Sequence, residues 1–222
     1  MNALCELVIR IDPENRRIRL ENNENGIVNY KEISPEALMD SFRQSIRTEG
    51  MMSGFLPPNC FHITVNPDKS KVYCLWYPEL HADISYYGTE YENFPLPRLV
   101  FSFRVSDQGK VSACKLGVID DERPTAETNM YHYPFSNVGG FNLCVGNNAL
   151  PVYKKPHTLA NLPGFLLRLP NNNDSYRQGN NKLSLPYREL LNHLKDKEPS
   201  YYYSDILVPN GKCLGDFVSG RY

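Results

Sequence analysis

The sequence lacks an excess of either charge. It has 24 Lys and Arg residues against 25 Asp and Glu residues, which gives a formal charge of −1 over 222 residues. Proteins that bind nucleic acid usually carry a basic field, so this balance speaks against that class. Apolar residues make up 41% of the chain, a fraction typical of a globular protein with its own hydrophobic core.

Long apolar runs and paired cysteines are also missing. No segment approaches the ~20 apolar residues that a membrane-spanning helix needs. Residues 1–12 lack the basic start and apolar block of a secretory signal. The six cysteines show no CxxC spacing, which a structural zinc site usually requires. We therefore expect a cytoplasmic protein with reduced thiols and no metal or organic cofactor.

Turn-forming residues, by contrast, are abundant. The chain has 22 Asn and 17 Pro residues, which indicate many turns, long loops and a modest helix content. Residues 1–30 alternate and turn as a β-hairpin does. Ser34-Pro35 then marks the start of a helix, whose apolar residues recur at spacings of three and four until Gly50, a suitable C-cap.

The middle of the chain predicts an antiparallel meander of about four strands within residues 60–118. A run over residues 82–86 is expected to extend the same sheet. Helical patterns follow over residues 158–169 and 186–197, the second with Leu190, Leu191 and Leu194 on one face. The predicted fold class is therefore α+β.

Between these parts, residues 120–156 show no lasting periodicity, and an ordered loop of that length is usually functional. Within it, His132, Pro134 and Asn137 precede Cys144, with Gly139-Gly140 placed for a tight reversal. Cys144 is surrounded by turn residues, so it is the candidate for a reactive thiol. Asn137 either braces the loop or faces a developing oxyanion, and we expect His132 mainly to organise the loop.

The remaining cysteines have a simpler interpretation. Four of them lie in strand-like runs, where a free cysteine usually packs as a small apolar residue; they are Cys5, Cys60, Cys74 and Cys114. Cys213 lies beside a turn, and nothing in the sequence marks it as catalytic.

The order His–Pro–Asn followed by Cys seven residues later resembles the active-site loop of ubiquitin-conjugating enzymes. The wider run Tyr131–Asn147 is more closely similar to PRTRC system protein B, a prokaryotic family called family D that is similar to those enzymes. Phe55-Leu56-Pro57-Pro58 and the segment from Leu96 to Phe101 also resemble that family's pattern. Tyr133 departs from the pattern because it separates His132 from Pro134, and two residues separate Pro134 from Asn137.

This resemblance implies a ubiquitin-conjugating-enzyme-like fold, with an antiparallel four-stranded meander, a preceding helix, C-terminal helices and an extra N-terminal β-hairpin. We expect a single domain over 1–222, divided into a hairpin extension (1–30), a conjugating-like core (34–197) and a tail (198–222). The matched residues imply that Cys144 accepts a ubiquitin-like C-terminus as a thioester. They further imply that Asn137 supports the loop and the oxyanion, and that His132 organises the loop.

The resemblance also implies partners, and two other functions stay open. The expected partners are a ubiquitin-like protein, a ThiF-like activating enzyme and a JAB-type metallopeptidase. One alternative is an inactive relative that binds the partner without chemistry. The other is a cysteine hydrolase in which His132 or His157 activates Cys144. The first acidic residue after the cysteine is Asp174, and nothing in the sequence places it near the thiol.

Overall fold

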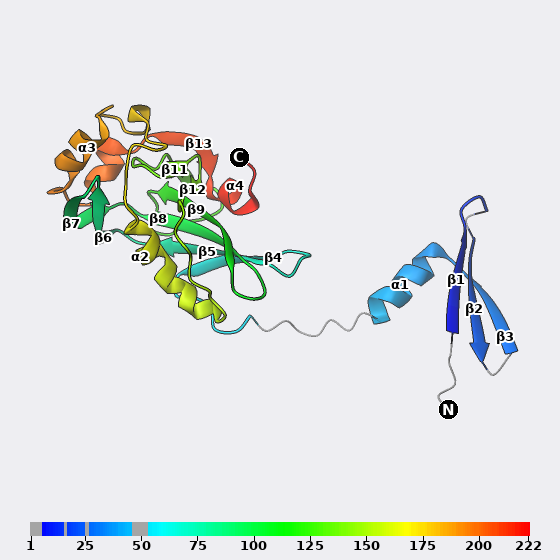
Figure 1. Cartoon of the computed structure of the whole chain (residues 1–222). Coiled ribbons are helices and arrows are strands. Elements are labelled where there is room, and N and C mark those ends of the chain that lie inside the picture. Colours follow the sequence, from blue (N-terminus) through cyan, green and yellow to red (C-terminus); the bar gives the residue numbers. More distant parts are fainter. Residues whose placement is uncertain (1–5, 16, 25–26, 46–52) are drawn as a thin grey trace. The chain divides into compact units, whose positions relative to one another are not determined.

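The computed structural model describes residues 6–15, 17–24, 27–45 and 53–222 (Figure 1). The chain divides into two compact units, Met1–Met52 and Ser53–Tyr222. The boundary falls inside the 34–197 core expected from the sequence and groups the helix at Pro35 with the N-terminal strands.

The N-terminal unit is a three-stranded antiparallel sheet followed by one helix. Its elements are β1 (Glu6–Asp12), β2 (Arg17–Glu24), β3 (Ile27–Ile33) and α1 (Pro35–Ser45). The hairpin expected from the sequence is β1–β2, and β3 adds a strand that was not predicted. The Ser34 Oγ accepts the Ala37 N–H at 3.1 Å, so the predicted N-cap is confirmed. The predicted C-cap at Gly50 lies outside the described residues.

The second unit is built on one antiparallel sheet. Its four long strands lie side by side in the order β4 (Cys60–Val65), β5 (Lys71–Tyr77), β8 (Leu99–Val105) and β9 (Val111–Ile119). Short strands continue it beyond β9: β10 (Asn129–Tyr131), β11 (Val138–Gly139), β12 (Asn142–Leu143) and β13 (Pro209–Cys213). A mixed α and β chain with antiparallel sheets is thus confirmed.

The prediction that residues 82–86 extend this sheet is wrong. They belong to β6 (Leu80–Tyr86), which pairs with β7 (Thr89–Leu96) in a separate two-stranded sheet. The hairpin turn contains Gly88 at a φ of +76°, a conformation that suits glycine. The buried residues Tyr91, Phe94 and Leu96 of β7 give β6 an apolar partner close in sequence, and β5 pairs directly with β8.

Helices cover the two faces of the sheet around two hydrophobic clusters. The larger cluster lies under η1 (Pro156–Asn161), α2 (Leu162–Leu167), α3 (Tyr187–Leu194) and η3 (Tyr202–Ile206). In α3 the predicted apolar face is fully buried, with Leu190, Leu191 and Leu194 each 0% exposed. The smaller cluster lies between β8, β9 and α4 (Leu214–Ser219), and the short turn η2 (Gln178–Asn180) lies in the loop before α3. Within residues 6–15, 17–24, 27–45 and 53–222, every helix is too short or too polar to span a membrane.

Candidate active site

The loop that carries Cys144 contains a short β-hairpin with two-residue strands and a two-residue turn. Its strands are β11 and β12, with Val138 paired to Leu143. Gly140 opens the turn at a φ of +62°, a region that other residues seldom adopt. At the open end, the Cys144 N–H donates to the Asn137 carbonyl at 2.7 Å. The seven-residue spacing in the sequence is therefore the length of this hairpin, and it brings Asn137 and Cys144 together.

The thiol of Cys144 differs from the other described thiols in its exposure. Cys74 and Cys114 lie 0% and 7% exposed in the sheet, and burial raises the pKa of each to about 11. Cys60 is half-buried, and burial raises its pKa as well. Among the five cysteines that the structure describes, Cys144 alone is exposed.

The burial of the other cysteines can be compared with the roles predicted for them from the sequence. Cys74 and Cys114 are packing residues as predicted, and Cys5 lies outside the described residues. Cys213 is half-buried at the start of α4, where its Sγ donates to the Asp216 carboxylate at 3.3 Å. Its thiol therefore has a local structural partner.

Asn137 braces the base of the hairpin through its side chain and its backbone. It has a φ of +65°, in the left-handed region that asparagine tolerates better than most residues. Its Nδ2 donates to the Pro170 carbonyl at 3.2 Å, and its N–H donates to the Asp174 carbonyl at 3.0 Å. In this arrangement the amide points to the loop after α2.

His132 lies ahead of the hairpin and does not touch Cys144 by a hydrogen bond. Its backbone N–H donates to the Val208 carbonyl at 3.0 Å, and the residue is half-buried. Burial, aided by the positive charge of Arg177, lowers the pKa of the imidazole. Within the described part of the chain, no histidine forms a hydrogen bond to the Cys144 thiol; His157 is exposed on η1.

A buried polar network below the hairpin was missed by the sequence analysis. Ser136 is 1% exposed, and its Oγ donates to the Asn171 Oδ1 at 2.9 Å. The same oxygen lies 3.5 Å from the Asn137 Nδ2, and Ser136 also lies 3.4 Å from the Tyr187 hydroxyl. The only sequence signal was the asparagine run that begins at Asn171, and it does not say which groups the run contacts.

Asn171 also ties the loop after α2 to the β6–β7 hairpin. Its N–H donates to the Ser85 carbonyl at 2.9 Å, and its carbonyl accepts the Tyr87 N–H at 3.2 Å. Three residues later, the main chain of Asp174 meets Asn137, while the exposed carboxylate accepts the Asn172 amide at 2.8 Å. The structure thus brings the first acidic residue after Cys144 to the base of the hairpin, which the sequence did not predict.

Aromatic packing anchors the start of the loop. Phe135 is 2% exposed, and its ring contacts four others at centroid distances of 5.3–6.2 Å; these are Phe94, Tyr133, Tyr187 and Tyr202. Tyr133, which separates His132 from Pro134, is therefore part of the core contact. The residues that interrupt the tight tripeptide have a packing function.

An apolar groove of about 420 Å³ lies beside Cys144. The two neighbours of the cysteine, Leu143 and Val145, form part of its wall. The opposite wall is β9 between Lys110, which bridges to Val152, and Lys115, which pairs with Asn142. Between these two bridges, the edge of β9 that faces the groove pairs with no other strand among the described residues. The other edge of β9 pairs with β8. The groove therefore offers a strand edge and an apolar wall to an extended chain.

The described residues contain no group of three or more His, Cys, Asp or Glu side chains that could hold a metal ion. The candidate site is thus an exposed thiol on a braced hairpin, with a polar network below it and an apolar groove beside it.

Comparison with known proteins identifies one family. No curated protein and no solved structure matches the chain. The sequence model of prokaryotic E2 family D matches residues 30–209, which include the candidate site and most of the chain. The resemblance seen in the loop residues is therefore confirmed over a much longer segment, and the chain belongs to prokaryotic E2 family D.

Proposed function

We propose that this protein carries a ubiquitin-like protein as a thioester on Cys144 and transfers it to an amine or a thiol. Membership of prokaryotic E2 family D supports a conjugating-enzyme-like role. The single observation that carries the finer proposal is the position of Cys144: an exposed thiol at the open end of a hairpin whose turn is held by the buried Phe141. An accessible thiol is what covalent catalysis by cysteine requires.

The chemistry uses two acyl transfers and no organic cofactor. In the first, the Cys144 thiolate attacks the carbonyl of a thioester on the activating enzyme; a new C–S bond forms, the old one breaks, and the leaving thiolate takes up a proton. In the second, an acceptor amine attacks the carbonyl on Cys144; a C–N bond forms and the C–S bond breaks. The proton lost by the amine restores the thiol.

The apolar groove suits the extended end of the carried protein. Leu143 and Val145 line it on either side of the cysteine in sequence. The edge of β9 opposite them offers backbone groups to an extended peptide, and the apolar wall offers packing to its side chains. We propose that this groove holds the C-terminal residues of the ubiquitin-like protein.

Asn137 and His132 have supporting roles in this proposal. Asn137 holds the Cys144 backbone through its carbonyl and the neighbouring loop through its amide. Its contact with Pro170 favours the bracing role over direct oxyanion stabilisation. Burial lowers the pKa of the His132 imidazole and so favours its neutral form, and we assign to this residue the organisation of the loop.

The partners follow from the family resemblance. A ThiF-like enzyme would activate the ubiquitin-like protein and charge Cys144, and a JAB-type metallopeptidase would remove the conjugated protein. The proposal thus places this chain between activation and transfer in a bacterial ubiquitin-like conjugation system of the PRTRC type.

A second candidate is an inactive relative that binds the same partner without chemistry. The observation that favours it is the Asn137 side chain, whose amide is engaged by Pro170. This candidate predicts partner binding that is indifferent to Cys144. A cysteine hydrolase has less support, because no imidazole is hydrogen-bonded to the thiol among the described residues.

The test is a charging assay with the purified chain, its neighbouring ubiquitin-like and activating proteins, and ATP. We expect a band on gels that disappears with reductant and is absent in Cys144→Ala. Cys144→Ser should give a band that resists reductant but is lost in base, because an oxygen ester replaces the thioester. A reductant-sensitive band that persists in Cys144→Ala would refute the proposal, and Cys213→Ala is the matched control.

A further inference from the structure

Residues 214–222 lie beyond the segment that the family model matches, yet they pack against the hairpin that carries Cys144. The contact is made by Phe141, the residue after Gly140 in the hairpin turn. Phe141 is 4% exposed, and its ring lies 5.1 Å from the Phe217 ring and 4.8 Å from the Tyr222 ring, both edge-on. The turn of the hairpin is thus held from the side of α4.

The segment is itself firmly attached to the second unit. The N–H groups of Leu214 and Gly215 donate to the Thr128 and Ala126 carbonyls at 2.9 and 2.8 Å. Leu214 and Phe217 are 3% and 1% exposed. Because α4 is anchored at its first turn, it can transmit a restraint to Phe141.

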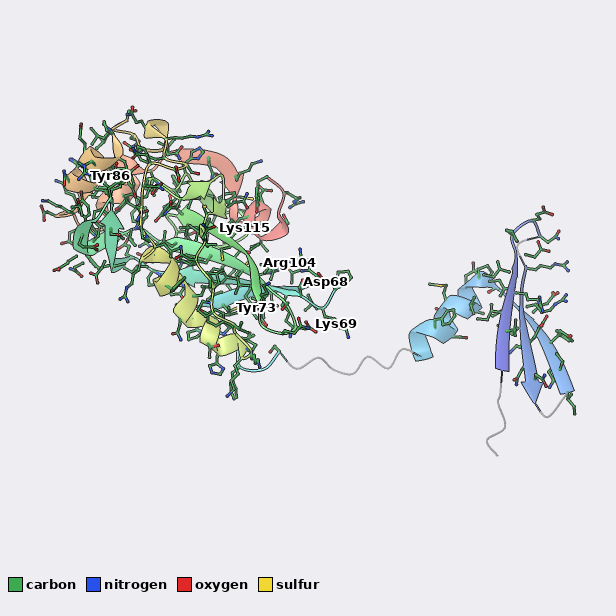
Figure 2. The ribbon with its side chains drawn as sticks, viewed as in Figure 1. Asp68, Lys69, Tyr73, Tyr86, Arg104 and Lys115 are labelled. Carbon is green, nitrogen blue, oxygen red and sulfur yellow. The ribbon has the colours of Figure 1, made fainter. Side chains whose placement is uncertain are left out.

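Strand β9 also holds the hairpin. The Leu116 N–H donates to the Phe141 carbonyl at 2.9 Å, and Lys115 pairs with Asn142 in β12. The Lys115 Nζ also lies 4.7 Å from the centre of the Tyr222 ring, a cation–π distance. Figure 2 shows Lys115 on β9 near the red ribbon of α4. Lys115 therefore contacts the hairpin strand through its backbone pairing and Tyr222 through its side chain.

We propose that residues 214–222 clamp the hairpin and thereby position Cys144 for acyl transfer, with Phe217 and Tyr222 as positioning residues that act through Phe141. The hairpin has only two short strands, and isolated two-stranded hairpins are marginally stable. The clamp holds the turn, and the Asn137–Cys144 hydrogen bond holds the open end. The functional part of this inference rests on the proposed acyl transfer, whereas the restraint itself does not.

Hydrogen–deuterium exchange on the full chain tests the restraint. Tyr222 is 43% exposed, so Tyr222→Ala leaves the core intact. We expect exchange within residues 137–144 to rise roughly threefold to tenfold, the factor implied by the loss of one aromatic pair. Tyr222→Phe keeps the ring and should exchange as the wild type does. Phe217→Leu is a second variant that keeps an apolar side chain but loses the ring contact, and it should also raise exchange.

Tyr30→Ala is the matched control, because Tyr30 is also an exposed ring below a cation, with Arg19 at 5.9 Å, but belongs to the other unit. It should leave exchange in residues 137–144 unchanged. Unchanged exchange in Tyr222→Ala and Phe217→Leu, or an equal rise in Tyr30→Ala, would overturn the clamp.

Charging of Cys144 is then measured on the same variants. We expect slower thioester formation in Tyr222→Ala and a normal rate in Tyr222→Phe, while chemical denaturation shows that both variants are as fully folded as the wild type under the assay conditions. A normal rate in Tyr222→Ala despite faster exchange would overturn the positioning role. A wild-type chain that forms no thioester would refute the proposed function instead, and the exchange result would still decide the restraint.

Discussion

Cysteine side chains are buried in two of the long strands but exposed at the end of the β11–β12 hairpin. In β5 and β9 the thiols of Cys74 and Cys114 are buried, and burial raises their pKa values to about 11. On the hairpin the neighbours of Cys144 are buried or half-buried while the thiol itself is exposed. The difference teaches that residues near Cys144, such as Phe135 and Phe141, supply the packing of this region, while the thiol itself stays exposed.

The largest expected difference is in thiol reactivity. With iodoacetamide and native protein at pH 8, we expect Cys144 to be alkylated at least ~100 times faster than Cys74 or Cys114, because reaction needs an accessible thiolate. Peptide mapping by mass spectrometry at several times measures each site. Equal rates at the three sites in folded protein would remove the contrast between strands and hairpin.

The next effect concerns the anchor of the loop. Phe135→Ala should lower the free energy of unfolding by about 3–5 kcal/mol, because it removes a ring that is packed against four others. Chemical denaturation measures the change. Phe55→Ala is the matched control, since Phe55 is 87% exposed and should change stability by less than about 0.5 kcal/mol. Similar losses in the two variants would show that Phe135 is no anchor.

One substitution at two positions sharpens the comparison further. Cys74→Ser places a hydroxyl in a site that is 0% exposed and should cost about 1–3 kcal/mol of unfolding free energy. Cys144→Ser changes an exposed atom and should cost less than about 0.5 kcal/mol. Chemical denaturation of both variants measures these losses. A larger loss of unfolding free energy in Cys144→Ser than in Cys74→Ser would contradict the account.

The smallest effect is the pH dependence contributed by His132. Its pKa is lowered in the folded chain by burial and by Arg177, so the unfolded chain binds the proton more readily. The contribution of His132 is therefore complete above the unfolded pKa of about 6.5 and is lost as the pH falls from there through the lower folded value.

The corresponding variant is His132→Gln, with His157→Gln as the control at an exposed site. The melting temperature of His132→Gln should fall less between pH 7.5 and pH 5 than that of the wild type, and His157→Gln should follow the wild type. An identical pH dependence in all three proteins would show that His132 is not held neutral.

The predictable parts of the site were the local ones. The tight reversal predicted at Gly139-Gly140 is confirmed, although the short strands β11 and β12 on either side of it were not predicted. The apolar face of α3 was likewise readable from its helical spacing. The contacts of Asn137 with Pro170 and Asn171 join segments 33 and 34 residues apart, and no periodicity encodes such a pairing.

The wrong prediction for β6 has a related cause. Residues 82–86 alternate as a strand does, but this alternation does not indicate which other strand they pair with. Pairing with β7 across the turn at Gly88 removes β6 from the main sheet. For the same reason, the sequence did not predict strand β3 or the position of Asp174 at the base of the hairpin. Each depends on which segments lie next to each other in the fold.

The most direct test of the central claim is to map which cysteine carries the acyl group. The chain is charged with the ubiquitin-like protein, digested without reductant and analysed by mass spectrometry, with Cys144→Ala and Cys74→Ala treated in parallel. The account predicts a reductant-labile adduct on the peptide of Cys144, lost in Cys144→Ala and kept in Cys74→Ala. An adduct on another cysteine, or none while the activating enzyme is charged, would contradict it.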